Sequence, residues 1–210
     1  MCRARFISLW NRCVTRSGPD DAENVFAVLN QNYSLPDRHY HTFDHIKASL
    51  GHLDDVREQS NQPDALEMAV WFHDAIYDAR AKDNEFQSAE LFVRVASKNV
   101  PKRFIDMVHD LIMVTVHPSE PKSGDEKLMV DIDLSSFGLP WPQFIALGEL
   151  ARKEFPHLSD REFHRNELEF FEMLGNRPQF YFSEFFRARY EAQARDNLER
   201  KIADLRSRVY

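Results

Sequence analysis

Residues 63–78 read PDALEMAVWFHDAIYD, and this stretch decides the expected fold. A proline followed by an aspartate is favoured in the first turn of an α-helix. The apolar residues then recur at the spacing of one helix face, as Leu66, Ala69, Val70, Phe72 and Ile76. The pattern predicts a helix that packs into a core and carries the polar pair His73-Asp74 at its end.

The same helical pattern continues on both sides of this stretch. Apolar spacing and helix-start residues predict further helices within residues 1–19, 19–35, 42–56, 83–95, 101–116, 142–155, 159–174 and 182–205. The chain has only six glycines in 210 residues and no recurring alternation of β-branched residues, which disfavours a sheet. We therefore expect an all-α fold in which residues 1–210 form one single-domain helical bundle.

Composition limits the partners and the compartment. The formal net charge is −7, which argues against a broad nucleic-acid surface, so no stable nucleic-acid partner is expected. The chain has only two cysteines, which disfavours a disulfide framework. Such a low cysteine content is typical of cytoplasmic proteins, so a cytoplasmic location is expected. No run of 18 apolar residues occurs, so no membrane span is expected. The arginines within residues 1–19 are also typical of a transit peptide, although helical spacing there favours a packed helix.

The pair His73-Asp74 is the first candidate for chemistry. Neighbours on a helix point about 100° apart, so they converge on one point only where a helix end lies against it. Imidazole nitrogen and carboxylate oxygen together suit Mn, Fe, Co, Ni or Zn. The alternative is a histidine at a helix C-terminus beside a solvated aspartate.

Two further segments extend this candidate site. His45 opens the inward face of the helix expected at 42–56 and precedes His73 by 28 residues, enough for two antiparallel helices and a turn. Asp131 and Asp133 lie in the otherwise apolar segment 128–134, where a buried carboxylate needs a partner. The alternative for this segment is a surface turn with both aspartates solvated.

The order His…His-Asp…Asp, with each member on an apolar helical segment, resembles the signature of the HD superfamily of metal-dependent phosphohydrolases. The phrases RHYHTFDHI, WFHDAIYD, DNEFQSAELF and DIDLSSFG, and the tail EFPHLSDREFHRNELEFFEMLGNRPQFY, are similar to one bacterial subfamily of predicted HD phosphohydrolases. The resemblance covers about residues 25–200. It implies an HD-type bundle whose metal-site core spans about residues 38–135, with C-terminal helices of about residues 140–205 packed on it.

The resemblance implies the metal ligands residue by residue. His45 is the first ligand, His73 and Asp74 are the doublet, and Asp133 is the last acid, with Asp131 open as the alternative. One divalent ion is implied, Mn, Fe, Co, Ni, Zn or Mg.

The implied activity is hydrolysis of a phosphate ester, of a nucleotide or a related small phosphorylated metabolite. Four protein ligands leave positions on an octahedral ion for a water and a phosphate oxygen. Asp74 is expected to accept a proton, Glu85 to hold a second water, and Arg38 to contact the phosphate. His41, Lys82 and His117 are the expected substrate-binding residues.

Two other functions stay open. Some HD-domain proteins bind two metals and are oxygenases or cyclic-dinucleotide hydrolases, which requires two further histidines between the doublet and the last aspartate. The candidates His109 and His117 are eight residues apart, a spacing that fits poorly and favours one metal. The second alternative is a non-catalytic domain that senses a metal or a nucleotide.

The C-terminal third is rich in aromatic residues, namely Phe170, Phe171, Phe180, Tyr181, Phe182, Phe185 and Phe186. We expect them to pack the last two helices onto the core. Any that stay exposed would form a dimer contact, so the chain is expected to be a monomer or a homodimer.

Overall fold

The computed structural model describes residues 2–15, 21–117 and 120–209. These residues form ten α-helices and three short 3-10 helices with no strand among them, which confirms the all-α class. The α-helices are α1 (Cys2–Cys13), α2 (Asp21–Tyr33), α3 (Phe43–Val56), α4 (Pro63–Phe72), α5 (Asn84–Ala96), α6 (Lys102–Met113), α7 (Gly124–Asp133), α8 (Trp141–Lys153), α9 (Asp160–Gly175) and α10 (Glu184–Val209). The 3-10 helices are η1 (Arg57–Gln59), η2 (Val114–Val116) and η3 (Leu134–Gly138).

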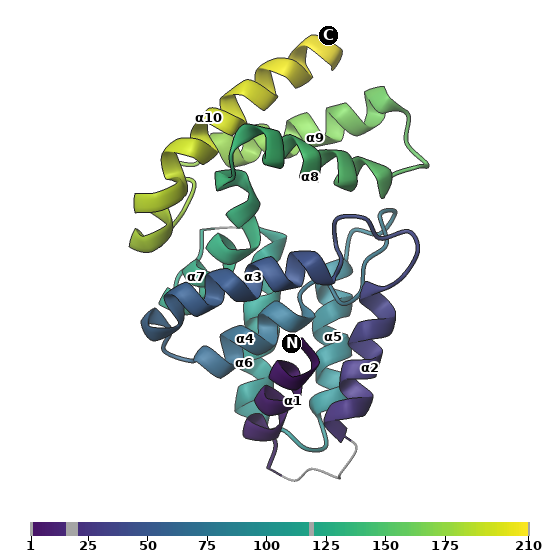
Figure 1. Ribbon diagram of the computed structural model, residues 1–210, viewed down its shortest axis with the longest axis vertical. Coiled ribbons are helices and arrows are strands. Elements are labelled where there is room, and N and C mark those ends of the chain that lie inside the picture. Colours follow the sequence, from purple (N-terminus) through teal and green to yellow (C-terminus); the bar gives the residue numbers. More distant parts are fainter. Residues whose placement is uncertain (1, 16–20, 118–119, 210) are drawn as a thin grey trace.

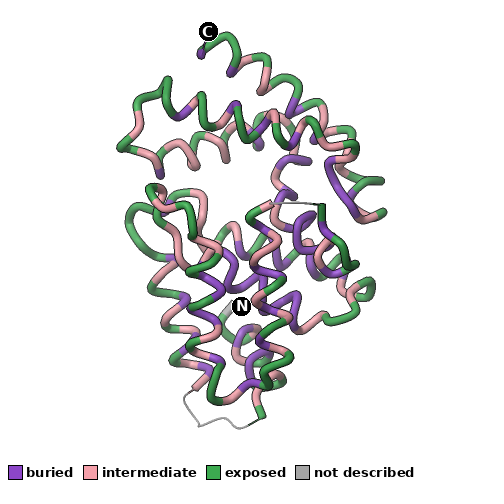
Figure 2. The backbone as a smooth tube through the Cα atoms, turned by 180° about the vertical axis from the view of Figure 1, so that it is seen from behind, coloured by how far each residue is buried: buried purple, intermediate pink, exposed green. Residues whose placement is uncertain are grey.

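The helices are arranged in two layers (Figure 1). Helices α1–α7 make a lower bundle, and α8, α9 and α10 lie across its upper end. Buried residues are concentrated inside the lower bundle, whereas α9 and α10 carry theirs at intervals (Figure 2). One hydrophobic cluster runs from Phe6 in α1 to Leu198 in α10, so the two layers belong to a single compact domain.

Helix α4 is the centre of the lower bundle. All of its residues from Ala65 to Phe72 are buried, as expected for a helix that is surrounded by others. Helices α1, α3, α5, α6 and α7 pack around it. The helix ends at Phe72, so the expectation that Ile76 continues its buried face is wrong, and Ile76 is only half-buried.

Local sequence explains where the helices that carry the site begin. The Thr42 side chain accepts a hydrogen bond from the Asp44 backbone N–H and starts α3, as its sequence predicts. Ser123 does the same for the Glu126 N–H and starts α7. The segment 128–134 is therefore most of a buried helix, and the alternative of a surface turn is wrong.

The upper layer is joined to the bundle by buried polar contacts as well as by aromatic packing. The Asn197 side chain, fully buried in α10, donates to the carbonyls of Phe137 and Leu139, both at 2.7 Å. The expected packing role is confirmed for Phe180, Tyr181 and Phe186, which are 0 % exposed.

None of the helices in the described part of the chain combines the length and the apolar character needed to cross a bilayer.

Candidate metal centre

Three helix ends of the lower bundle meet at one point. His45 lies in the first turn of α3, His73 and Asp74 directly follow α4, and Asp133 is the last residue of α7. Helices α3, α4 and α7 contact one another in pairs, so these four side chains come together. They form a group that can hold a metal ion, with one ligand atom from each residue and all four atoms within 4.8 Å of one another.

The distances between the ligand atoms are those of a single site. His73 Nε2 lies 3.1 Å from His45 Nε2, 3.2 Å from Asp74 Oδ2 and 3.3 Å from Asp133 Oδ1. His45 Nε2 lies 3.4 Å from Asp74 Oδ2 and 3.7 Å from Asp133 Oδ1. Ligands bound about 2.1 Å from one ion lie about 3 to 4.2 Å apart, so these atoms fit around one divalent cation.

The orientation of His73 supports this fit. Its Nδ1 donates a hydrogen bond to the Val70 carbonyl oxygen at 2.9 Å, so in the neutral ring the lone pair is on Nε2, the atom that faces the other ligand atoms. Nε2 then points at the Nε2 of His45. Two imidazole nitrogens that face each other in this way, beside two carboxylates, form a ligand set suited to a transition metal.

The electrostatics of the centre favour ionised carboxylates. Burial alone would lower the pKa of His73, but Asp74 and Asp133 hold it well above its usual value. Burial alone would raise the pKa of Asp133, but hydrogen bonds from His117, His45 and His73 hold it well below its usual value. A proton on His73 thus keeps the carboxylates ionised in the absence of metal, and a bound cation would take the place of that proton.

The structure separates the two candidate aspartates of α7. Asp133 enters the centre, whereas the fully buried Asp131 accepts hydrogen bonds from the backbone N–H groups of Phe182 and Ser183 at 2.8 and 2.7 Å. The carboxylate of Asp131 therefore holds the backbone of the two residues that precede α10. Of the two aspartates, only Asp133 belongs to the group that could hold a metal ion.

Arg38 holds the loop that carries the doublet. Its guanidinium donates to the backbone carbonyls of His41, Asp74 and Ala75, at 3.1, 2.6 and 2.9 Å, and the residue is 6 % exposed. These contacts occupy Nη1 and Nη2, whereas Nε is buried without a hydrogen-bond partner among the described residues. The structure thus places Arg38 as a support for Asp74, in contrast to the expected phosphate contact.

A cavity of about 250 Å³ opens onto the metal centre. Asp74, Asp133, Glu85 and His117 all line it. Glu85 lies in the first turn of α5, and burial raises its pKa, as do the negative charges of Asp74 and Asp133. The expected position of Glu85 near the doublet therefore agrees with the structure.

His117 reaches the same cavity through an unusual backbone conformation. Its φ of 56° and ψ of 37° are left-handed, which is uncommon for a residue with a side chain and is enriched at functional sites. The Nε2 atom of His117 lies 3.4 Å from Asp133 Oδ2, whereas His45 and His73 approach the other carboxylate oxygen, Oδ1.

Two other histidine and lysine candidates lie elsewhere. His109 Nδ1 lies 3.4 Å from Oδ1 of its neighbour Asp110. His109 does not line this cavity and does not belong to the ligand group, so it is not brought together with His117 as a second metal site would require. Lys82 is exposed and does not line the cavity, which separates it from the expected substrate contact.

Glu154 is a buried residue of the site that sequence reasoning missed. It accepts hydrogen bonds from the backbone N–H groups of His39, Tyr40 and His41, and its Oε2 lies 2.6 Å from His41 Nδ1. His41 precedes α3, stacks on Tyr77 and lines the cavity as expected. Its partner lies 113 residues away, so no local pattern signals this contact.

Comparison of the chain with protein-family models, curated proteins and solved structures found no match.

Proposed function

We propose that this protein is an HD-type, metal-dependent phosphohydrolase that acts on a nucleotide or another small phosphorylated metabolite. The convergence of two imidazole nitrogens and two carboxylate oxygens at the mouth of a 250 Å³ cavity carries the proposal. The side chains of His73 and Asp133 are 1 % and 17 % exposed, so the open side of the ligand group is the carboxylate side that faces this cavity.

A divalent ion bound by these four residues would lower the pKa of a water and polarise a phosphate oxygen. Glu85 stands on the cavity wall, where its raised pKa suits a group that holds a water and accepts its proton. Asp74 has both a ligand oxygen in the group and a place in the cavity wall.

His41 supplies a donor for the phosphate, and His117 contributes to the same cavity wall with its Nε2 on Asp133. Both line the cavity, and His41 is oriented by Glu154, which occupies its Nδ1 and leaves Nε2 for a substrate oxygen. The Arg38 guanidinium donates hydrogen bonds to backbone carbonyls, and neither Arg38 nor Lys82 lines the cavity. Charge on the phosphate is therefore met by His41 and the cation.

Metal content and turnover test this proposal together. Elemental analysis should find about one divalent ion per chain, lost in His73→Ala and Asp133→Ala and retained in His109→Ala, a histidine outside the group. The protein supplied in turn with Mn, Fe, Co, Ni, Zn and Mg should hydrolyse members of a panel of nucleotides and small phosphate esters. Glu85→Gln should keep the metal and lower kcat about 100-fold or more.

Metal that is retained with no turnover on the whole panel would contradict the hydrolase and favour the non-catalytic sensor. Two ions per chain would contradict the mononuclear site.

A further inference from the structure

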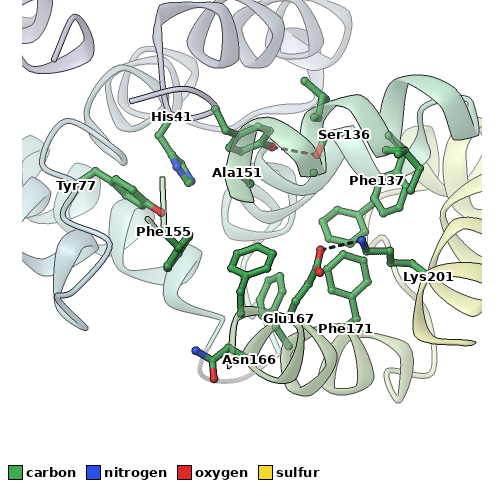
Figure 3. Close-up of a pocket in the computed structure, with 17 residues that line it drawn as sticks. His41, Tyr77, Ser136, Phe137, Ala151, Phe155, Asn166, Glu167, Phe171 and Lys201 are labelled. Carbon is green, nitrogen blue, oxygen red and sulfur yellow. Dashed lines mark hydrogen bonds and ion pairs between the residues drawn. The ribbon is translucent and has the colours of Figure 1, made fainter. Parts of the chain in front are cut away.

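A second cavity of about 320 Å³ lies between the upper layer and the loops of the lower bundle. Its walls are mainly aromatic and aliphatic side chains from η3, α8, α9 and the loop between α8 and α9, among them Phe137, Phe144, Phe155 and Phe171. Figure 3 shows aromatic rings around the space, those of Phe137, Phe155 and Phe171 among them, with His41 and Tyr77 on one side and the Glu167–Lys201 pair on the other. The volume suits a small organic group.

This cavity adjoins the one at the metal centre. Tyr40, His41, Phe137 and Phe170 line both. A molecule with a phosphate at the metal centre would therefore extend past His41 and place its organic part among the aromatic rings.

The far wall carries a buried charge with one free oxygen. Glu167 in α9 is 10 % exposed at its side chain, and its Oε1 lies 3.3 Å from Lys201 Nζ in α10. Within the described part of the chain, its Oε2 is buried with no hydrogen-bond partner. A buried carboxylate oxygen left without a donor is costly, which suggests that a ligand supplies one. Burial also raises the pKa of Glu167.

A glycine inside α8 keeps the cavity open. Gly148 lines it, and a Cβ atom added there would meet nothing within 4 Å. Close packing thus does not require this glycine, although a glycine in a helix interior is destabilising relative to alanine. Its missing side chain leaves room beside the aromatic walls.

We propose that this cavity binds the organic group of the phosphate ester, and that this group is a flat aromatic or heteroaromatic ring with an N–H or O–H donor for Glu167. The link to the ester rests on the proposed function, whereas ring binding does not. A polyol such as a bare sugar would find too few polar partners on these walls. An alkyl chain would leave Glu167 Oε2 unpaired.

Binding to the metal-free protein tests the cavity without catalysis. Indole and benzothiophene have nearly the same shape, but only indole has an N–H donor. Measured by saturation-transfer NMR and competition, indole should bind about 10-fold more tightly than benzothiophene. In Glu167→Leu/Lys201→Met, which removes both charges together and keeps a packed wall, the two should bind equally.

Gly148→Leu should fill the cavity and weaken both ligands at least about 10-fold, while the better helix former keeps the fold. Gly51→Leu is the matched control, because Gly51 is exposed in α3 and its added Cβ also meets nothing, so both ligands should bind as in the wild type. Binding of neither ligand, or binding unaffected by Gly148→Leu, would overturn the proposal. An indole preference that survives in the double variant would overturn the role of Glu167.

Turnover then tests the link to the metal centre. With metal bound, kcat/KM should be higher for 3-indoxyl phosphate than for ribose 5-phosphate, and Gly148→Leu should remove the advantage. Ring binding without hydrolysis of any ester would contradict the proposed function alone. Hydrolysis with equal kcat/KM for both esters would contradict the inference alone.

Discussion

At the scale of single residues, the two aspartates of α7 show how position on a helix separates two roles. Asp131 and Asp133 are two residues apart, so their side chains point about 200° apart. One faces the metal centre and the other faces the start of the upper layer. The same residue type in one apolar helix therefore belongs to the candidate metal centre in one case and accepts backbone hydrogen bonds in the other.

This separation predicts that alanine substitution of Asp131 and of Asp133 has different effects. Asp133→Ala should lose the bound metal, because it removes one of the four ligands. Asp131→Ala should keep the metal but lower the free energy of unfolding by about 2 kcal/mol or more, because two backbone N–H groups lose their acceptor. Urea denaturation and elemental analysis of both variants check this. Equal loss of metal in the two would contradict the assignment of Asp133.

At the scale of elements, a contact between α3 and α10 joins the two layers. His52 in α3 packs its ring against Phe186 and Tyr190 of α10. Its Nδ1 is buried with no hydrogen-bond partner in the described part of the chain. The ring is thus held as an apolar packing element, and the fold favours its neutral form.

This contact predicts a pH dependence of stability. Burial lowers the pKa of His52 in the folded state below its usual value of 6.5. Below that value the unfolded state binds more protons than the folded state, so His52 contributes stability that is lost as the pH falls from about 6.5. Thermal melts should show that His52→Leu loses less stability than the wild type between about pH 7.5 and pH 5. A larger loss in the variant would contradict this sign.

At the scale of the whole molecule, the metal centre joins segments that are distant in sequence. Its candidate ligands come from α3, the end of α4 and α7, and the loop that carries Asp74 is held by Arg38 from before α3. A ligand that binds the folded state alone stabilises all of these elements together.

Metal binding should therefore raise the stability of the entire domain. At a free metal concentration about 100 times Kd, the gain is about 2.7 kcal/mol. A chelator should lower the Tm of the wild type and of His109→Ala, and should leave the Tm of His73→Ala unchanged. Differential scanning calorimetry measures the shift. An equal shift in His73→Ala would place the ion elsewhere.

The helical class and most helix starts follow from the sequence, because caps and apolar periodicity are local properties of the chain. The family resemblance implied His45, His73, Asp74 and Asp133 as ligands and left Asp131 as an alternative. The structure shows the different surroundings of the two aspartates, since these depend on which neighbour each face of α7 meets. Glu154, Glu167 and the engaged guanidinium of Arg38 likewise depend on partners 113, 34 and 36 residues away. Local sequence determined the elements and their polar ends, and only tertiary packing decided which of those ends share a site.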